Sequence, residues 1–162
     1  MTDTIRVIVE IPKGSRNKYE MDHETGRIRL DRTLYASVHY PADYGFIDGT
    51  LGEDTDPLDA LVLVSEPTFP GCVIDVRPVG VFKMRDDMGI DHKVLCVPVT
   101  DPLWRTIETL KDVPPHLLDE IEHFFNVYKT LEKKETVTDG WEDAEVARSI
   151  VQQAFARFGG GA

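Results

Sequence analysis

Hydrophobic and polar residues alternate over much of the first hundred positions, which predicts a series of short strands. Residues 5–11 place four aliphatic side chains on one face and Glu10 on the other. Residues 18–21 and 27–30 flank a turn that contains Gly26 and are typical of a hairpin. Further strands are expected at residues 61–64, 72–76 and 79–82, and on both sides of the glycine turn within 83–97.

After position 101 the spacing of apolar residues changes to a helical period. Asp101 and Pro102 favour the start of a short helix. Pro114 and Pro115 open a longer helix, whose apolar residues recur every three to four positions up to Tyr128. A last helix is expected after Trp141, ended by the glycines at 159–161.

Strands first and helices last predict an α+β fold, with a small antiparallel OB-like β-barrel flanked by two main C-terminal helices. A chain of 162 residues suits one domain, residues 1–162. Closure of the barrel would bring the strand faces that carry Glu10, Lys18 and Glu20 close to the acidic loops described below.

Composition narrows the possible function. The formal charge of −11 and the lack of a basic patch argue against nucleic-acid binding. No apolar run approaches the length of a membrane span, and residues 1–6 have no apolar segment typical of a secretory signal. Cys72 and Cys96 lack CxxC spacing and are expected to be reduced, which favours a cytoplasmic location.

An acidic loop at residues 54–59 provides the first candidate chemistry. Asp54, Asp56 and Asp59 would repel one another by about 1 to 4 kcal/mol per pair, so a folded site needs cations, and hard Mg²⁺ prefers such oxygen ligands. In an extended run Asp54 and Asp56 would share a face. An EF-hand does not fit, because its glycine position holds Asp59 and its final glutamate position holds Ser65. A solvated acidic turn is the simpler alternative.

A second acidic cluster is expected at the tip of the hairpin in 83–97, where Asp86 and Asp91 would approach each other. By itself this cluster could be an ordinary polar turn.

The ordered motifs resemble those of the soluble family I inorganic pyrophosphatases of the short bacterial type, nearly end to end. The segments that carry the resemblance are Glu10-Ile11-Pro12, Lys18-Tyr19-Glu20, Asp31-Arg32, Tyr40-Pro41 with Tyr44-Gly45, residues 54–59, Arg77-Pro78-Val79-Gly80, residues 86–93, and His123-Phe124-Phe125 with Tyr128-Lys129.

The resemblance implies Mg²⁺-dependent hydrolysis of pyrophosphate to two phosphates, with several Mg²⁺ ions per site, and a homohexamer. By position, the implied metal ligands are Glu10, Glu20, Asp54, Asp59, Asp86 and Asp91. Asp56 resembles the carboxylate that takes a proton from the attacking water, and Asp91 is a second candidate for that role. The implied phosphate-binding residues are Lys18, Arg32, Tyr44, Lys93, Tyr128 and Lys129.

The sequence departs from the family pattern at three positions. Thr55 replaces a residue that is usually glycine, aspartate, serine or asparagine, and it is expected to change little. Asp87 stands where glutamate is common. Glu135 stands where the family often has a phosphate-binding lysine, and Lys134 is a candidate replacement one position earlier.

Two other functions remain compatible with these residues. One is a non-catalytic acidic OB-like module that binds a divalent cation or a protein. The other is a metal-dependent phosphatase that acts on nucleotides or other phosphate esters. The first has no need for the phosphate-binding side chains, and the second would be distinguished by its substrates.

Overall fold

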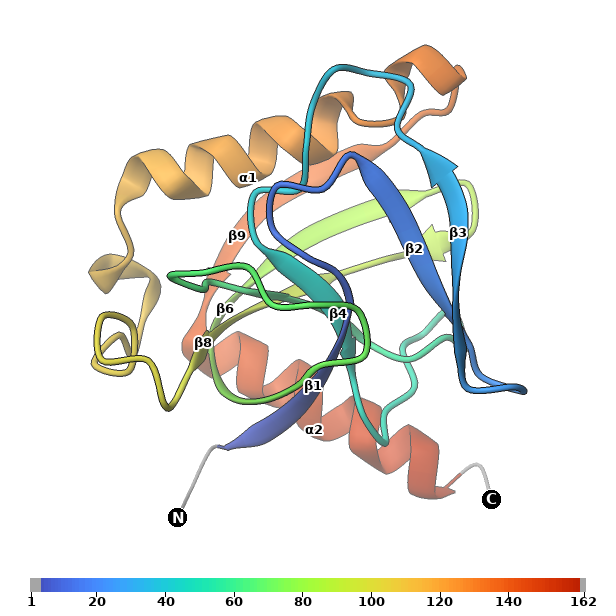
Figure 1. The fold of residues 1–162 in the computed structure, drawn as a ribbon. Helices are drawn as coiled ribbons and strands as arrows, with labels where there is room; N and C mark the ends of the chain where they lie inside the picture. The colour runs from blue at the N-terminus through green and yellow to red at the C-terminus, as the bar shows by residue number, and fades with distance from the viewer. Residues whose placement is uncertain (1–3, 161–162) are drawn as a thin grey trace.

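The computed structural model describes residues 4–160, so residues 1–3 and 161–162, at the two ends of the predicted domain, lie outside the described residues. Strands form a barrel that lies between two helices (Figure 1). The elements in chain order are β1 Ile5–Ile11, β2 Asn17–Asp22, β3 Arg27–Thr33, β4 Asp43–Ile47, β5 Asp59–Val62, β6 Val73–Asp86, β7 Gly89–Ile90, β8 Lys93–Pro98, η1 Leu110–Asp112, α1 Pro115–Val127, η2 Thr130–Glu132, β9 Val137–Asp143 and α2 Ala144–Gly160.

Five strands close the barrel in the order β1, β4, β5, β8, β6 and back to β1. Four of these pairings are antiparallel, whereas β5 and β8 run parallel. The short β7 and the longer β9 pair with β6, and β2 with β3 forms a separate two-stranded sheet. The expected α+β barrel with two C-terminal helices is confirmed, with one parallel pairing that the sequence analysis did not anticipate.

The barrel strands β4, β5 and β8 are buried on both faces along nearly their whole length, in keeping with their largely apolar sequences. Along β5, Leu61 packs into the cluster that contains Phe125 of α1, whereas Ala60 and Val62 pack into the cluster that contains Val151 of α2. Figure 1 shows the two helices on opposite sides of the barrel. The molecule therefore has two hydrophobic clusters, divided by the strands.

Close approach of β1 and β4 requires a glycine at position 45. Gly45 pairs with Val9, and a Cβ at Gly45 would lie only 2.0 Å from the Ile8 carbonyl oxygen. This contact keeps β4, which carries Tyr44, in register beside Glu10 on β1.

Several element boundaries differ from the sequence-based predictions. The two strands expected at 72–76 and 79–82 are one strand, β6, with an irregularity between Pro78 and Gly80. Trp141 lies inside β9, a strand that the pattern did not predict. The last helix, α2, runs into the glycines that were expected to end it, as far as Gly160. Phe158 near its end is 54% exposed, whereas Ala147 and Ala154 pack against the barrel.

No helix forms at Asp101 and Pro102, where the chain makes consecutive turns. Asp101 does accept a backbone hydrogen bond from Arg105 at 2.8 Å, but the turn does not continue into a helix. Arg77 ties this segment to β6 by donating to the carbonyl oxygens of Arg105 and Ile107. The Arg77 motif therefore has a structural role in the fold.

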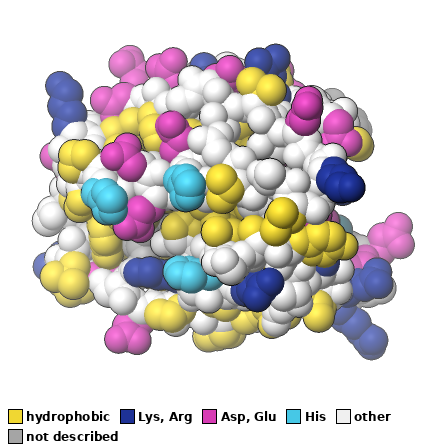
Figure 2. All heavy atoms as spheres, turned by 90° about the horizontal axis from the view of Figure 1, so that it is seen from above, with side chains coloured by type: hydrophobic (Ala, Val, Ile, Leu, Met, Phe, Trp, Pro, Cys, Tyr) yellow, Lys and Arg dark blue, Asp and Glu magenta, His cyan; other side chains and the backbone are white. Residues whose placement is uncertain are grey.

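Among residues 4–160, no helix is long and apolar enough to cross a membrane. On the face that Figure 2 shows, Lys and Arg side chains are scattered among acidic and hydrophobic ones.

Candidate active site

The acidic loop before β5 is a tight turn. The Gly52 N–H donates to the Asp56 carbonyl oxygen at 2.7 Å, and the Thr55 N–H donates to the Gly52 carbonyl oxygen at 3.1 Å. The Asp54 carboxylate accepts a hydrogen bond from the Asp56 N–H at 3.1 Å. The predicted extended arrangement of Asp54 and Asp56 is therefore wrong, because these bonds fold the loop back on itself. Asp59 is the first residue of β5.

Thr55 takes up an uncommon backbone conformation in this turn, with φ of 71°. A left-handed conformation costs a residue with a Cβ about 1 to 2 kcal/mol, and β-branching makes it still less common. Glycine and asparagine adopt it more readily. Thr55 therefore places strain between two of the candidate site carboxylates.

Lys93 is a buried cation between two of the predicted metal ligands. Its side chain is 2% exposed, and Nζ donates to Asp59 at 2.8 Å, to Asp91 at 2.9 Å and to the Tyr44 hydroxyl at 2.8 Å. The parallel pairing of β5 with β8 brings Asp59 opposite Lys93, and β4 supplies Tyr44 from the neighbouring position. Three strands and one loop thus build this cluster.

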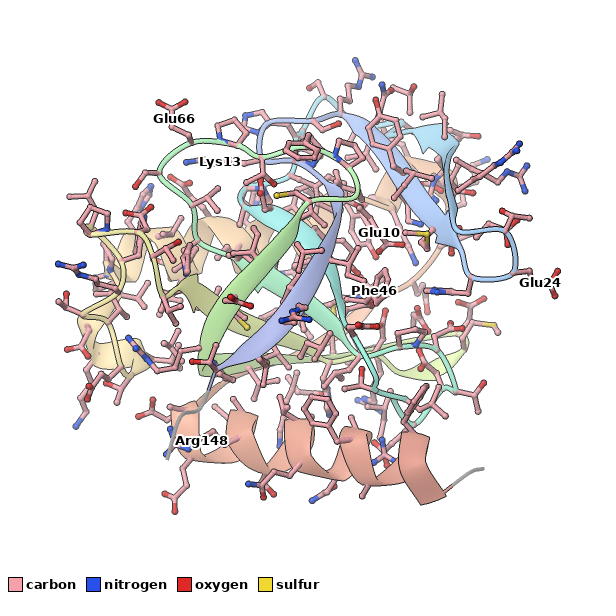
Figure 3. The ribbon with its side chains drawn as sticks, turned by 60° about the horizontal axis from the view of Figure 1, so that its bottom comes forward. Glu10, Lys13, Glu24, Phe46, Glu66 and Arg148 are labelled. Carbon is pink, nitrogen blue, oxygen red and sulfur yellow. The ribbon has the colours of Figure 1, made fainter. Side chains whose placement is uncertain are left out.

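All the predicted site residues except Arg32 line one cleft, which has a cavity volume of about 220 Å³. Seven carboxylates and three lysines line it, so acidic side chains outnumber cations by four if all are ionised. Figure 3 shows Glu10 and Phe46, which both line the cleft, on the side of the barrel near β2 and β3. The predicted residues in its wall are Glu10, Lys18, Glu20, Tyr44, Asp54, Asp56, Asp59, Asp86, Asp91, Lys93, Tyr128 and Lys129.

Burial and mutual charge shift the pKa values of these carboxylates. Burial raises the pKa of Glu10 from 4.5 to about 7, although a hydrogen bond from the Met21 N–H opposes the shift. Burial also raises the pKa of Asp59 to about 6, with Lys93 opposing and Asp91 adding to the shift. Burial acts to raise the pKa of Asp91 too, but the charge and hydrogen bond of Lys93 outweigh it, so that pKa is lowered. Without further cations, protonation of Glu10 and Asp59 relieves part of the charge.

The donor set fits a hard divalent cation. Carboxylate oxygens are the ligands that Mg²⁺ prefers, and the excess of carboxylates in the cleft needs positive charge. Within residues 4–160, no three acidic, histidine or cysteine side chains already form a metal-ligand group. At the centre of the cluster, the Lys93 ammonium donates hydrogen bonds to both Asp59 and Asp91.

Most of the predicted phosphate-binding residues lie in the cleft wall, but Arg32 does not. Lys18 and Lys129 are partly exposed, with Lys129 Nζ at 3.8 Å from Asp86. Burial raises the pKa of Tyr128 to about 12, so its hydroxyl stays protonated and can donate. Arg32 instead lies between Asp31 and Glu132.

Sequence reasoning missed three residues that line the cleft. These are His23, Phe46 and Met88. The His23 ring lies edge-on to Phe46, with ring centroids 5.0 Å apart. His23 lies in the turn between β2 and β3. It reaches the cleft because of how that hairpin packs against the barrel, which the alternating strand pattern does not specify.

The candidate replacement Lys134 is not among the residues that line this cleft. It lines a neighbouring depression with Asp87, Glu135 and four other residues, one of which, Asp86, also lines the cleft. Lys134 therefore does not stand among the cleft residues in place of the family lysine.

An acidic cleft with lysines in its wall suits divalent cations together with a phosphate-bearing anion, as in the class of metal-dependent hydrolases that act on phosphate compounds. The comparisons agree with that class. A family model described as inorganic pyrophosphatase matches residues 7–159. The inorganic pyrophosphatase of Methanosarcina mazei is 59% identical over 152 residues, covering 94% of this chain and 90% of that protein. The protein of the same name from Leifsonia xyli is 57% identical, covering 93% of each.

Solved structures give the same result. The crystal structure of inorganic pyrophosphatase from Thermus thermophilus matches with a TM-score of 0.94 and 43% identity, covering 97% of this chain and 92% of that chain. The chain therefore belongs to the inorganic pyrophosphatase family, and it is an enzyme, a hydrolase of the diphosphatase class.

Proposed function

We propose that the chain hydrolyses inorganic pyrophosphate to two phosphates in an Mg²⁺-dependent reaction, by direct attack of a water molecule on phosphorus. The observation that carries this proposal is the single cleft lined by seven carboxylates and three lysines. Carboxylates in that number suit several divalent cations, and the lysines suit a polyanion. The residues that would hold Mg²⁺ are Glu10, Glu20, Asp54, Asp59, Asp86 and Asp91.

Bound Mg²⁺ would neutralise the anionic substrate and lower the pKa of a water molecule. The chain's own residues would do the rest. Lys18, Lys129 and Tyr128 would bind phosphate oxygens from the cleft wall, together with Tyr44 at its base. The charge of Lys93, whose three N–H donors are already engaged, would help to attract the phosphate and to stabilise charge on the departing group. Arg32 would reach a phosphate oxygen from its position beside Asp31.

The proton of the attacking water would pass to Asp56. As the new oxygen–phosphorus bond forms, the bridging oxygen–phosphorus bond breaks and its electrons leave with the second phosphate. Asp56 is exposed and lines the cleft, whereas Asp91 accepts a hydrogen bond from Lys93 that lowers its pKa and makes it a weaker base. The hydrogen bond from Lys93 to Asp91 and the exposure of Asp56 to the cleft thus favour Asp56 over Asp91 as the general base.

The direct test compares phosphate release from pyrophosphate, ATP and a phosphate monoester, each with Mg²⁺ and with a chelator. The proposal expects pyrophosphate to dominate and the chelator to abolish turnover. Dominant turnover of ATP or the monoester would favour the phosphatase alternative, and no turnover of any substrate would favour the cation- or protein-binding module.

We also propose a cytoplasmic location and a homohexamer. Cys72 and Cys96 are unpaired in residues 4–160, which is compatible with a reducing compartment. The hexamer rests on analogy with the family alone. Sedimentation of the purified protein tests the oligomer, and a different stoichiometry would overturn it.

A further inference from the structure

Arg32 and Glu132 form a pair that joins two parts of the molecule. Arg32 lies on β3, opposite Lys18 on β2, within the small sheet that stands apart from the barrel. Glu132 is the last residue of η2, three positions after Lys129. The pair therefore connects the hairpin that carries Lys18 and Arg32 to the segment that carries Tyr128 and Lys129.

Two carboxylates hold the Arg32 guanidinium. Glu132 Oε1 lies 2.8 Å from Arg32 Nε, and Asp31 Oδ2 accepts a hydrogen bond from Nη1 at 2.5 Å. Among the described residues, Nη2 has no hydrogen-bond acceptor, so it is the guanidinium nitrogen that remains available to a ligand oxygen. Arginine binds phosphate well when its planar fork is oriented in advance.

Burial of the Glu132 carboxylate is energetically unfavourable, which suggests that the residue has a functional role. Its side chain is 6% exposed, and its Oε2 atom is buried without a hydrogen-bond partner in the described residues. Arg32 Nε is likewise close to Oε1 but lacks an aligned hydrogen bond. A buried ion pair contributes little net stability compared with apolar residues of similar size, because desolvation offsets its attraction. Stability alone therefore gives a poor account of Glu132.

We infer that Glu132 is a positioning residue for substrate binding: it holds Arg32 through Nε so that Nη2 is presented to a phosphate oxygen. This inference rests on the proposed function for the identity of the substrate. It predicts that loss of the Glu132 charge weakens phosphate binding while leaving the chemical step nearly intact, because Glu132 itself does not line the cleft.

Glu132→Gln keeps the shape of the side chain and removes its charge. We expect KM for pyrophosphate to rise about tenfold, as on weakening of one charge-assisted hydrogen bond from Arg32 to the substrate, with kcat changed by less than about threefold. The dissociation constant of inorganic phosphate, measured by calorimetry with Mg²⁺, should rise by a similar factor. Glu132→Asp retains the charge and should restore part of the affinity.

Asp139→Asn is the matched control, because Asp139 pairs with Arg85 at 3.2 Å but both side chains are about half exposed and neither lines the cleft. Its KM should stay within about twofold of the parent value. In an Arg32→Lys background, Glu132→Gln should have little further effect, because the group that it positions has gone.

An unchanged KM and phosphate affinity in Glu132→Gln would overturn the inference. So would a double variant in which KM rises by the product of the factors found for Glu132→Gln and Arg32→Lys alone. If Glu132→Gln does not fold, Glu132→Asp provides the test. A rise in KM when Glu132→Asp is made alone, with no further rise when it is added to Arg32→Lys, would support positioning. The same factor of increase in both backgrounds would refute it. Failure of the parent protein to hydrolyse pyrophosphate would overturn the proposed function, whereas the phosphate-binding comparison would still test the role of Glu132.

Discussion

Replacing Lys93 with methionine tests whether this buried ammonium compensates the charges of Asp59 and Asp91 in the cleft. Lys93 Nζ donates to Asp59, Asp91 and Tyr44 at 2.8 to 2.9 Å and is almost fully buried. Removal of one partner from a buried ion pair typically costs about 3 to 5 kcal/mol, because the other charge stays buried without compensation. We therefore expect Lys93→Met to lose about that much free energy of unfolding in the absence of metal.

Two conditions should restore stability to Lys93→Met. Mg²⁺ at about one hundred times its dissociation constant should return about 2.7 kcal/mol, because only the folded protein offers the site. A lower pH should also reduce the deficit. Without Lys93, Asp59 and Asp91 take up protons more readily in the folded variant than in the unfolded chain, so its stability rises as pH falls.

The assay is urea unfolding with chelator and with Mg²⁺, each at acidic and at mildly alkaline pH. Lys83→Met is the matched control, because Lys83 lies on neighbouring β6 and forms no ion pair within the part of the chain that the structure describes. A deficit in Lys93→Met, relative to the parent in chelator, that is the same at acidic and at mildly alkaline pH would refute the electrostatic reasoning and assign the effect to packing of the side chain.

Four further predictions follow from the site. Asp56→Asn should bind Mg²⁺ normally but lose turnover by about 10²- to 10⁴-fold, and a nearly parental rate would move the general-base role elsewhere. Asp59→Asn should weaken Mg²⁺ binding in calorimetry, and unaltered affinity would contradict its assignment as a ligand. Between pH 4.5 and about 7, Glu10 binds more protons in the folded, metal-free protein than in the unfolded chain. The free energy of unfolding should therefore fall as pH rises through that window, by at most about 3 kcal/mol. If the free energy of unfolding of Glu10→Gln depends on pH in the same way, Glu10 is excluded as the source. Thr55→Gly should raise the free energy of unfolding by up to about 1 kcal/mol, since glycine accepts the φ of 71° without strain, and a lower urea midpoint at unchanged slope would count against strain there.

Local patterns predicted those elements whose burial follows a simple period. β1, the β2–β3 hairpin and α1 all have apolar residues at strand or helix spacing, and the structure has them at nearly the predicted positions. β9 escaped prediction because it is rich in charged and polar residues and contains Gly140, so its pairing with β6 rather than its own pattern makes it a strand.

The candidate site depends on contacts between distant segments. Of these contacts, the sequence indicated only the approach of Glu10, Lys18 and Glu20 to the acidic loops. The resemblance supplied residues that do line one cleft, but the parallel pairing that sets Asp59 beside Lys93 is a matter of topology. The pairing of Arg32 with Glu132 joins residues one hundred positions apart, and no local spacing indicates it. The burial of Lys93 likewise results from closure of the barrel, which the local sequence around Lys93 does not indicate.

The central claim is that acidic side chains from separate elements form one site for divalent cations and a phosphate anion. Its most direct test is a crystal structure grown with Mn²⁺ and phosphate, in which anomalous scattering locates the metal. We expect Mn²⁺ to be bound by the carboxylates of Asp54, Asp59 and Asp91, with phosphate beside Lys18 and Lys129. Mn²⁺ located only outside this cleft, with Asp59 and Asp91 still bound to Lys93 alone, would contradict it.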